Sequence, residues 1–148
     1  YGERWGADGY QGALVTAEVI GVAGLNDLAE RLQQRTWHES VLSQLASYLA
    51  VMHSHGFAHG DLNWRNVLVN TNGEPGIFFI DCPGGRFWPW PLLAIKTAKD
   101  LWLLDKLGRQ HLSRSQRLRF YLQYRGIRRL NAADKQLLRR IVTKTKKS

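Results

Sequence analysis

The sequence predicts an α+β fold that is mainly helical and contains one β-hairpin. Residues 41–52 show the periodicity of a helix that ends before Gly56, with apolar side chains at Val41, Leu42, Leu45, Leu49 and Met52. Two short apolar runs, 67–69 and 77–80, flank the turn sequence of residues 70–73, as the strands of a hairpin do. Further helical patterns occur over 93–104 and 118–141, so we expect helices to dominate.

Composition indicates one globular unit. The chain has 148 residues, of which 44% are hydrophobic and 22% are charged, which is enough to bury one core. Its single cysteine, Cys82, excludes an internal disulfide and a cysteine-based zinc framework, and this fits a reducing compartment. We find neither a signal peptide nor an apolar run long enough to span a bilayer, so we expect a cytoplasmic protein.

The chemical signal lies in residues 59–66, which read HGDLNWRN, and in Asp81 at the end of the second apolar run. Transfer of a terminal phosphoryl group needs a carboxylate that receives the proton of the acceptor hydroxyl, and oxygen ligands for the Mg²⁺ on the triphosphate. The pattern His-x-Asp-x4-Asn supplies both. Asp61 is the candidate catalytic base, Asn66 binds the metal from the same loop, and Asp81 reaches the metal from the next strand.

The order of these elements indicates the large (C-terminal) lobe of a protein-kinase-like fold. A helix, the HGDLNWRN loop, a hairpin and a carboxylate follow one another as they do in kinases. An alternative interpretation gives these residues structural roles only: Asp61 and Asn66 cap turns, and Asp81 terminates a strand.

The loop favours a small-molecule, sugar or lipid acceptor over a peptide. Gly60 and Asn63 stand where protein kinases have the arginine that holds a phosphorylated activation loop and a lysine near the catalytic aspartate. Only 18 residues separate Asp81 from Asp100, and they contain no Ala-Pro-Glu. Peptide docking and control by a phosphorylated loop therefore have no evident anchor.

Two further residues resemble supporting residues of kinase folds. Asp100 lies in a helical pattern and resembles the helix aspartate that holds the catalytic-loop backbone, although a solvated side chain or a partner of Lys96 or Lys99 is the alternative. His59 has a similar supporting role in kinases. We expect neither residue to act as a catalytic base.

Three other features have two interpretations each. His53, His55 and His59 do not complete a convincing metal cluster, because no cysteine or carboxylate joins them. We expect Cys82 to be a small buried cysteine and not a reactive thiol beside the nucleotide. The two tryptophans at 88 and 90 form either an acceptor wall or lipid contact, or simply a cover for the core, which we favour slightly.

The positive charge is concentrated at the C-terminal end. Residues 109–148 hold 13 Lys or Arg and a single acidic residue, Asp134, whereas residues 1–108 hold 8 basic and 11 acidic side chains. Such a basic region is able to bind an anionic lipid surface, a phosphorylated glycolipid or nucleic acid, because the electrostatic attraction does not distinguish among them. The alternative is that these are the solvated faces of ordinary helices.

Several segments together resemble the bacterial lipopolysaccharide-core (Kdo/heptose, WaaP-like) kinase family. They are residues 13–21, 25–32, 59–63, the pair Asp100-Leu101 and the basic region 114–129. The resemblance implies an ATP- and Mg²⁺-dependent phosphotransferase that acts on a sugar hydroxyl of the lipopolysaccharide inner core, peripheral at the inner face of the inner membrane. It places a remnant of the small lobe and its hinge at 1–20 and the large lobe at 21–148. Residues 14–19 would be the last small-lobe strand and hinge, with the backbone of Ala17 and Val19 facing adenine.

The sequence departs from a complete kinase at its N-terminal end. A kinase also has a glycine-rich phosphate loop, a strand lysine and a helix glutamate, and we do not assign Gly2, Gly6, Gly9 and Gly12 to such a loop because no Val-Ala-x-Lys strand follows. We therefore expect a chain that is cut within the small lobe and lacks efficient phosphotransfer by itself. The alternatives are a pseudokinase or a module that binds anionic lipid or, less favoured, RNA.

Overall fold

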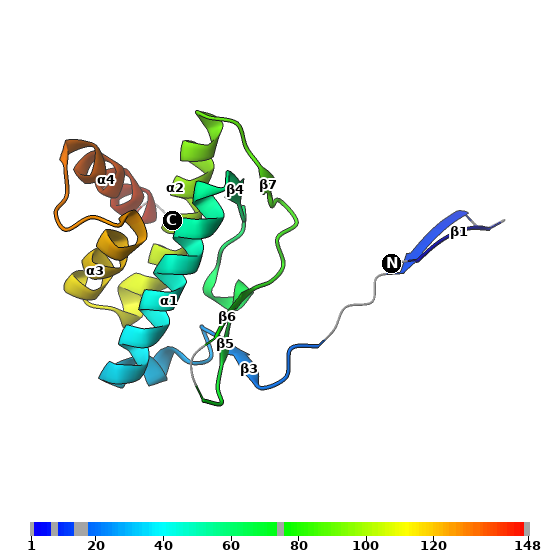
Figure 1. The fold of residues 1–148 in the computed structure, drawn as a ribbon, viewed down its shortest axis with the longest axis horizontal. Helices are drawn as coiled ribbons and strands as arrows, with labels where there is room; N and C mark the ends of the chain where they lie inside the picture. Colours follow the sequence, from blue (N-terminus) through cyan, green and yellow to red (C-terminus); the bar gives the residue numbers. More distant parts are fainter. Residues whose placement is uncertain (1, 7–8, 14–17, 74–75, 147–148) are drawn as a thin grey trace.

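The computed structural model describes residues 2–6, 9–13, 18–73 and 76–146 (Figure 1). In chain order, the elements are β1 (Gly2–Gly6), β2 (Gly9–Ala13), β3 (Val22–Gly24), a 3-10 helix (Ala29–Gln33), α1 (Arg35–Ser54), β4 (Phe57–Ala58), a 3-10 turn (Trp64–Asn66), β5 (Val67–Asn70), β6 (Ile77–Phe79), β7 (Arg86–Phe87), α2 (Leu92–His111), α3 (Arg114–Arg125) and α4 (Ala132–Lys146). The mainly helical α+β fold is confirmed.

The N-terminal strands β1 and β2 form an antiparallel hairpin, in which Gly2 pairs with Ala13 and Gly6 pairs with Gly9. The last small-lobe strand and its hinge are expected over 14–19, and of these residues 18 and 19 have no regular secondary structure. Residues 14–17, and with them the backbone of Ala17, lie outside the described part of the chain.

The helical core follows from the apolar periodicity. Val41, Leu45 and Leu49 are almost fully buried on one face of α1, which packs against α3, while α2 packs against α4. Full burial of one such side chain stabilises the fold by about 1.5–3 kcal/mol. Gly56 follows the end of α1 with a φ of +85°, a left-handed conformation that glycine adopts without steric cost, so the helix ends where the sequence predicts.

The predicted hairpin is confirmed as β5 and β6, which together with β3 form an antiparallel sheet in the order β3-β5-β6. Val67 and Val69 of β5 are fully buried, and the half-buried Leu68 and Asn70 alternate with them toward the other face. Strand β6 ends at Phe79, one residue before the predicted end, and the Ile80 N–H donates to the Asn66 carbonyl at 3.0 Å. This bond brings the end of the hairpin beside the HGDLNWRN loop.

A second small pair of strands connects the chain before the HGDLNWRN loop with the chain after the hairpin. Strand β4, which precedes the loop, pairs antiparallel with β7, so that Phe57 lies opposite Phe87 and Ala58 opposite Arg86. The segment after Asp81 therefore returns to the beginning of the loop before α2 starts (Figure 1).

Helices α3 and α4 begin with side-chain caps. Ser113 and Gln116 form a reciprocal capping box at the start of α3, and Asn131 and Asp134 bind each other's backbone N–H at the start of α4. None of the helices described for this chain combines the length and the apolarity that crossing a bilayer requires.

Candidate functional site

The HGDLNWRN loop leaves β4 through a glycine that the backbone requires. Gly60 has a φ of +84°, and a Cβ at this position would lie 3.0 Å from the Gly84 carbonyl oxygen. Both the left-handed conformation and this contact disfavour a side chain. Steric constraints therefore favour glycine at the position where protein kinases have arginine.

Asp61 is held by the two asparagines of its own loop. The Asn63 Nδ2 donates to Asp61 Oδ1 at 2.6 Å, and the Asn66 Nδ2 donates to the Asp61 carbonyl at 2.8 Å and to Oδ2 at 3.2 Å. The carboxylate is still 38% exposed, so one acceptor group is both oriented and accessible from solvent. These are the properties that a general base needs.

Asn66 is buried, and its amide nitrogen takes the donor role because each Asp61 atom that it contacts is an acceptor. Its carbonyl oxygen is then the acceptor end of the side chain. An amide oxygen in this position is a suitable ligand for Mg²⁺, which prefers hard oxygen donors.

Asp81 lies where the backbone turns sharply at the end of the hairpin. Its φ of +52° is in the left-handed region, which costs a non-glycine residue roughly 1–2 kcal/mol. Residues in such conformations are concentrated at functional sites. The Asp81 side chain is exposed and lines one open cleft with Asp61 and Asn66.

The donor set of this cleft fits Mg²⁺ bound to a triphosphate. No group of three His, Cys, Asp or Glu that could hold a metal occurs among the described residues. A magnesium site does not need one, because Mg²⁺ in phosphotransferases takes one or two protein oxygens and completes its shell with phosphate oxygens and water. Asn66 and Asp81, which both line the cleft, are the residues that would supply these two oxygens.

Asp100 binds the loop from α2. Its side chain is fully buried, and it accepts hydrogen bonds from the backbone N–H of His59 at 2.8 Å and of Gly60 at 2.9 Å. His59, also buried, donates from Nε2 to the Ile80 carbonyl at 2.9 Å. The loop is thus fixed to α2 on one side and to the chain before Asp81 on the other. These hydrogen bonds account for the buried carboxylate of Asp100, so the alternative of a partner at Lys96 or Lys99 is not needed.

His53 extends this support, and the sequence did not indicate it. The buried ring of His53 places Nε2 3.3 Å from Asp100 Oδ2 and Nδ1 2.8 Å from the Tyr124 hydroxyl. A carboxylate only accepts, so Nε2 carries a proton, and in the neutral ring Nδ1 accepts from the Tyr124 hydroxyl. Burial raises the pKa of Tyr124 to about 12, which keeps this hydroxyl protonated. A chain of hydrogen bonds therefore runs from α3 to the HGDLNWRN loop.

Three further contacts at the loop were also not predicted. The Lys99 Nζ donates to the Gly60 carbonyl at 2.6 Å, and the buried Trp64 ring donates from Nε1 to the Leu104 carbonyl of α2 at 2.9 Å. Arg65, largely exposed, lies 3.6 Å from Asp61 Oδ2. All three contacts depend on the tertiary fold or on a side-chain rotamer, which spacing in the sequence does not encode.

Two expectations about the segment after Asp81 are wrong. Cys82 is exposed and lines the cleft, because the chain has left the sheet at this point and turns outward. Trp90 does not cover the core, since it is 77% exposed. Trp88 is half-buried, but its ring is covered by the cations of Arg86 and Lys96 at 3.9 and 4.2 Å from its centroid.

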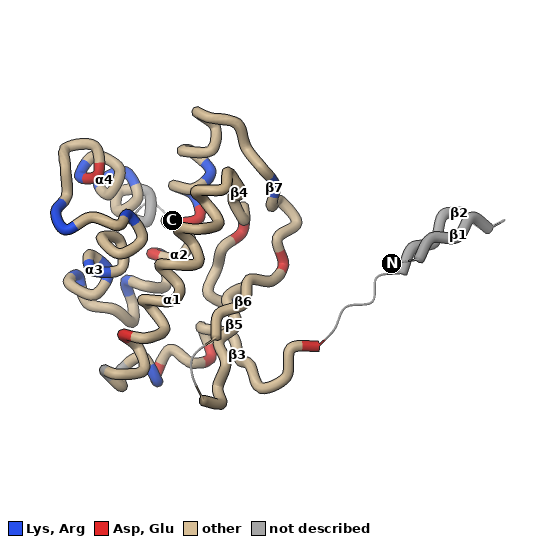
Figure 2. Tube along the Cα trace, viewed as in Figure 1, with Lys and Arg blue, Asp and Glu red and all other residues tan. Residues whose placement is uncertain are grey.

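Several cations of the basic region have internal partners. Arg109 and Arg117 both pair with Asp105, at 3.0 and 2.7 Å, and Arg125 pairs with Asp134 at 3.1 Å. These cations stabilise helix packing. Figure 2 shows further Lys and Arg positions along α3 and α4, and of these Arg114, Lys135, Arg139 and Arg140 have exposed side chains.

Asp134, the acidic residue of this region, is buried and bound from several sides. Burial alone would raise its pKa, but hydrogen bonds from the Tyr121 hydroxyl at 2.8 Å and from the Asn131 N–H, together with the nearby Arg125 charge, lower the pKa overall. The same contact and burial raise the pKa of Tyr121. Asp134 is therefore ionised and joins the end of α3 to the start of α4.

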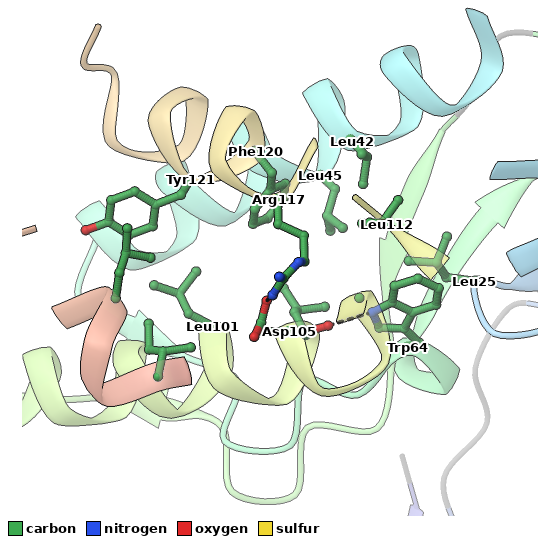
Figure 3. A pocket seen from close by; sticks show the side chains of 14 residues that line it. Leu25, Leu42, Leu45, Trp64, Leu101, Asp105, Leu112, Arg117, Phe120 and Tyr121 are labelled. Atoms are coloured by element: carbon green, nitrogen blue, oxygen red, sulfur yellow. Dashed lines mark hydrogen bonds and ion pairs between the residues drawn. The ribbon is translucent and has the colours of Figure 1, made fainter. Parts of the chain in front are cut away.

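An apolar pocket lies in the core of the helical lobe, where the Asp105–Arg117 ion pair and the ring of Trp64 face it (Figure 3). It encloses about 70 Å³ of free volume, which is too small for a nucleotide. Asp61, Asn66 and Asp81 do not line it. We therefore place the candidate chemistry in the open cleft.

Comparison with known proteins agrees with this geometry. Residues 1–87 match the sequence profile of the lipopolysaccharide kinase (Kdo/WaaP) family. Among solved structures, "WaaP in complex with acyl carrier protein" is similar with a TM-score of 0.77 and 22% sequence identity. The match covers 99% of this chain and 66% of that chain, so the chain spans just under two thirds of the length of the solved protein. No curated protein matches. The structural similarity confirms the protein-kinase-like fold.

Proposed function

Because the chain belongs to the lipopolysaccharide kinase (Kdo/WaaP) family, we propose that its complete reading frame encodes a kinase that transfers the γ-phosphoryl group of ATP to a sugar hydroxyl of the lipopolysaccharide inner core, on Kdo or heptose. The observation that carries this proposal is the shared cleft of Asp61, Asn66 and Asp81. A carboxylate that accepts a proton and two oxygen ligands for Mg²⁺ are what phosphoryl transfer requires of the protein.

In this proposal the acceptor hydroxyl donates a hydrogen bond to Asp61. As the hydroxyl oxygen bonds to the γ-phosphorus, the bond from phosphorus to the β,γ-bridging oxygen breaks, ADP leaves, and the hydroxyl proton passes to Asp61. The hydrogen bonds from Asn63 and Asn66 fix the carboxylate for this step. Mg²⁺, held by Asn66 and Asp81, would neutralise charge on the phosphate oxygens.

We assign the two lobes by similarity to the kinase family. Residues 1–20 belong to the small lobe and hinge, and residues 21–148 form the large lobe. Val19 is exposed and lies outside regular secondary structure, which leaves it accessible to a nucleotide base at the hinge. We assign adenine binding to the backbone of Ala17 and Val19, and place the enzyme at the inner face of the inner membrane.

The proposal is tested by incubating the protein encoded by the complete reading frame with γ-labelled ATP, Mg²⁺ and lipopolysaccharide core acceptors. We expect label in a phosphate ester of an acceptor that carries Kdo or heptose, and none when EDTA removes Mg²⁺. Absence of label in every acceptor, with nucleotide binding intact, would favour a pseudokinase or binding module instead. Binding of acyl carrier protein, which the similar WaaP structure contains, is a separate property that the same preparation can be assayed for.

A further inference from the structure

Four exposed apolar side chains follow the cleft within a short stretch of chain. Phe87, Trp90, Leu92 and Ile95 are 72%, 77%, 44% and 64% exposed. Single exposed apolar residues are common on soluble proteins, but a group of large ones so close together indicates an interaction surface. We call residues 86–99 the ledge.

The ledge combines these apolar groups with cations on one side of a helix. Positions 92, 95, 96 and 99 are spaced by three and four residues, so they share one face over the first two turns of α2. Trp90, Ile95, Lys96 and Lys99 also line a single wide groove beside α2. Apolar and cationic side chains of the ledge therefore lie together along the first two turns of α2.

All charged residues of the ledge are basic. Residues 82–99 contain Arg86, Lys96 and Lys99 and no acidic residue. Arg86 and Lys96 both contact the ring of Trp88, which holds the two cations close together. Exposed tryptophan next to lysine and arginine is the composition of a surface that lies in the interface of an anionic bilayer, with apolar rings at the level of the lipid headgroups.

The ledge is also connected to the candidate catalytic loop, by strand pairing and by a side-chain hydrogen bond. Strand β7, which contains Phe87, pairs with β4 directly before the loop, and Lys99 donates to the Gly60 carbonyl. Pro83, three residues before the ledge, lines the cleft itself. A surface that the ledge contacts is therefore held at a fixed position relative to Asp61.

We propose that the ledge docks on an anionic lipid bilayer and thereby holds the cleft over an acceptor sugar whose lipid is embedded in the same bilayer. This inference rests on the proposed glycolipid kinase function. Charge complementarity with anionic headgroups and the exposed rings favour a bilayer over an acidic protein, which would not require four large apolar groups.

The test is co-sedimentation of the complete protein with phosphatidylcholine vesicles that contain or lack phosphatidylglycerol. Two double variants change the ledge: Trp90→Ala with Ile95→Ala, and Arg86→Gln with Lys96→Gln. We expect wild type to bind the anionic vesicles, and each double variant to bind them about tenfold more weakly or worse, since both apolar burial and each cation near the surface contribute.

Two matched controls separate the ledge from other surfaces. Tyr48→Ala with Val51→Ala removes exposed apolar groups of α1, and Arg128→Gln with Arg129→Gln removes exposed cations between α3 and α4. We expect both to bind vesicles as wild type does. The proposal is overturned if wild type does not bind the vesicles, if it binds acyl carrier protein through the ledge instead, or if only the control cations matter.

Activity distinguishes failure of this inference from failure of the proposed function. On a water-soluble core oligosaccharide without lipid, the ledge variants should transfer phosphate at the wild-type rate, and on the same sugar embedded in vesicles they should be slower. If wild type phosphorylates neither acceptor but binds vesicles through the ledge, the kinase function fails and the docking surface stands. Equal activity of ledge variants and wild type on both acceptors would contradict the inference.

Discussion

Replacing Asp100 with alanine removes the acceptor that three donors share at the base of the candidate catalytic loop. The backbone N–H groups of His59 and Gly60 and the Nε2 of His53 all lie within 2.8–3.3 Å of its carboxylate. The side chain is fully buried. Loss of the carboxylate leaves two backbone donors without this partner, at about 1–3 kcal/mol each, so we expect a destabilisation of roughly 2–6 kcal/mol.

Hydrogen exchange measures this effect locally. The amides of residues 59 and 60 should exchange at least about 30-fold faster in the Asp100→Ala variant, because every 1.4 kcal/mol of lost protection is a factor of ten. The urea midpoint of the complete protein should fall as well. Glu39→Ala is the control, since it removes an exposed ion pair with Arg119 that contributes less than about 1 kcal/mol. Unchanged exchange at residues 59 and 60 would refute the supporting role.

Three further predictions concern stability. Tyr124→Phe leaves the buried Nδ1 of His53 without its donor and should cost about 1–2 kcal/mol, measured by urea unfolding. Gly60→Ala adds a Cβ to a left-handed and crowded position and should cost about 1–3 kcal/mol by the same assay, with lower turnover. Hydrogen bonds and Arg125 lower the pKa of Asp134, so its stabilisation is present near neutral pH and is lost as pH falls below about 4. The difference in melting temperature between wild type and Asp134→Asn should shrink accordingly.

Each of these predictions has a control within the chain. Tyr48→Phe changes an exposed tyrosine and should have no effect on the urea midpoint. Gly73→Ala has a similar φ of +78° but open space around its Cβ position, so it should cost less than Gly60→Ala. Equal costs at the two glycines would show that the contact with Gly84 is unimportant. A melting difference for Asp134→Asn that is independent of pH would contradict the assigned titration.

Local patterns account for the part of the fold that the sequence predicted. The periodicity of α1 and the paired runs of β5 and β6 are encoded within each segment, and the end of α1 is set by Gly56, which adopts a left-handed backbone. The grouping of Asp61, Asn66 and Asp81 was also predictable, because a short hairpin necessarily returns the chain to the loop before it.

The parts that could not be predicted depend on contacts between distant segments. His53 and Tyr124 are 71 residues apart, and no spacing rule joins them. Whether Cys82 and Trp90 are buried depends on where the chain runs after Asp81, which their residue types do not determine. In the basic region, charge counting did not reveal that Arg109 and Arg117 converge on Asp105.

The most direct test of phosphoryl transfer through this cleft is the turnover of the Asp61→Asn variant on a lipopolysaccharide core acceptor, with Mg²⁺–ATP affinity measured in parallel. Asparagine keeps the size of the side chain but cannot take the hydroxyl proton. We predict that turnover falls by about 10²–10⁴-fold while nucleotide affinity changes by less than about threefold. Turnover within tenfold of wild type would contradict the assignment of Asp61 as the catalytic base.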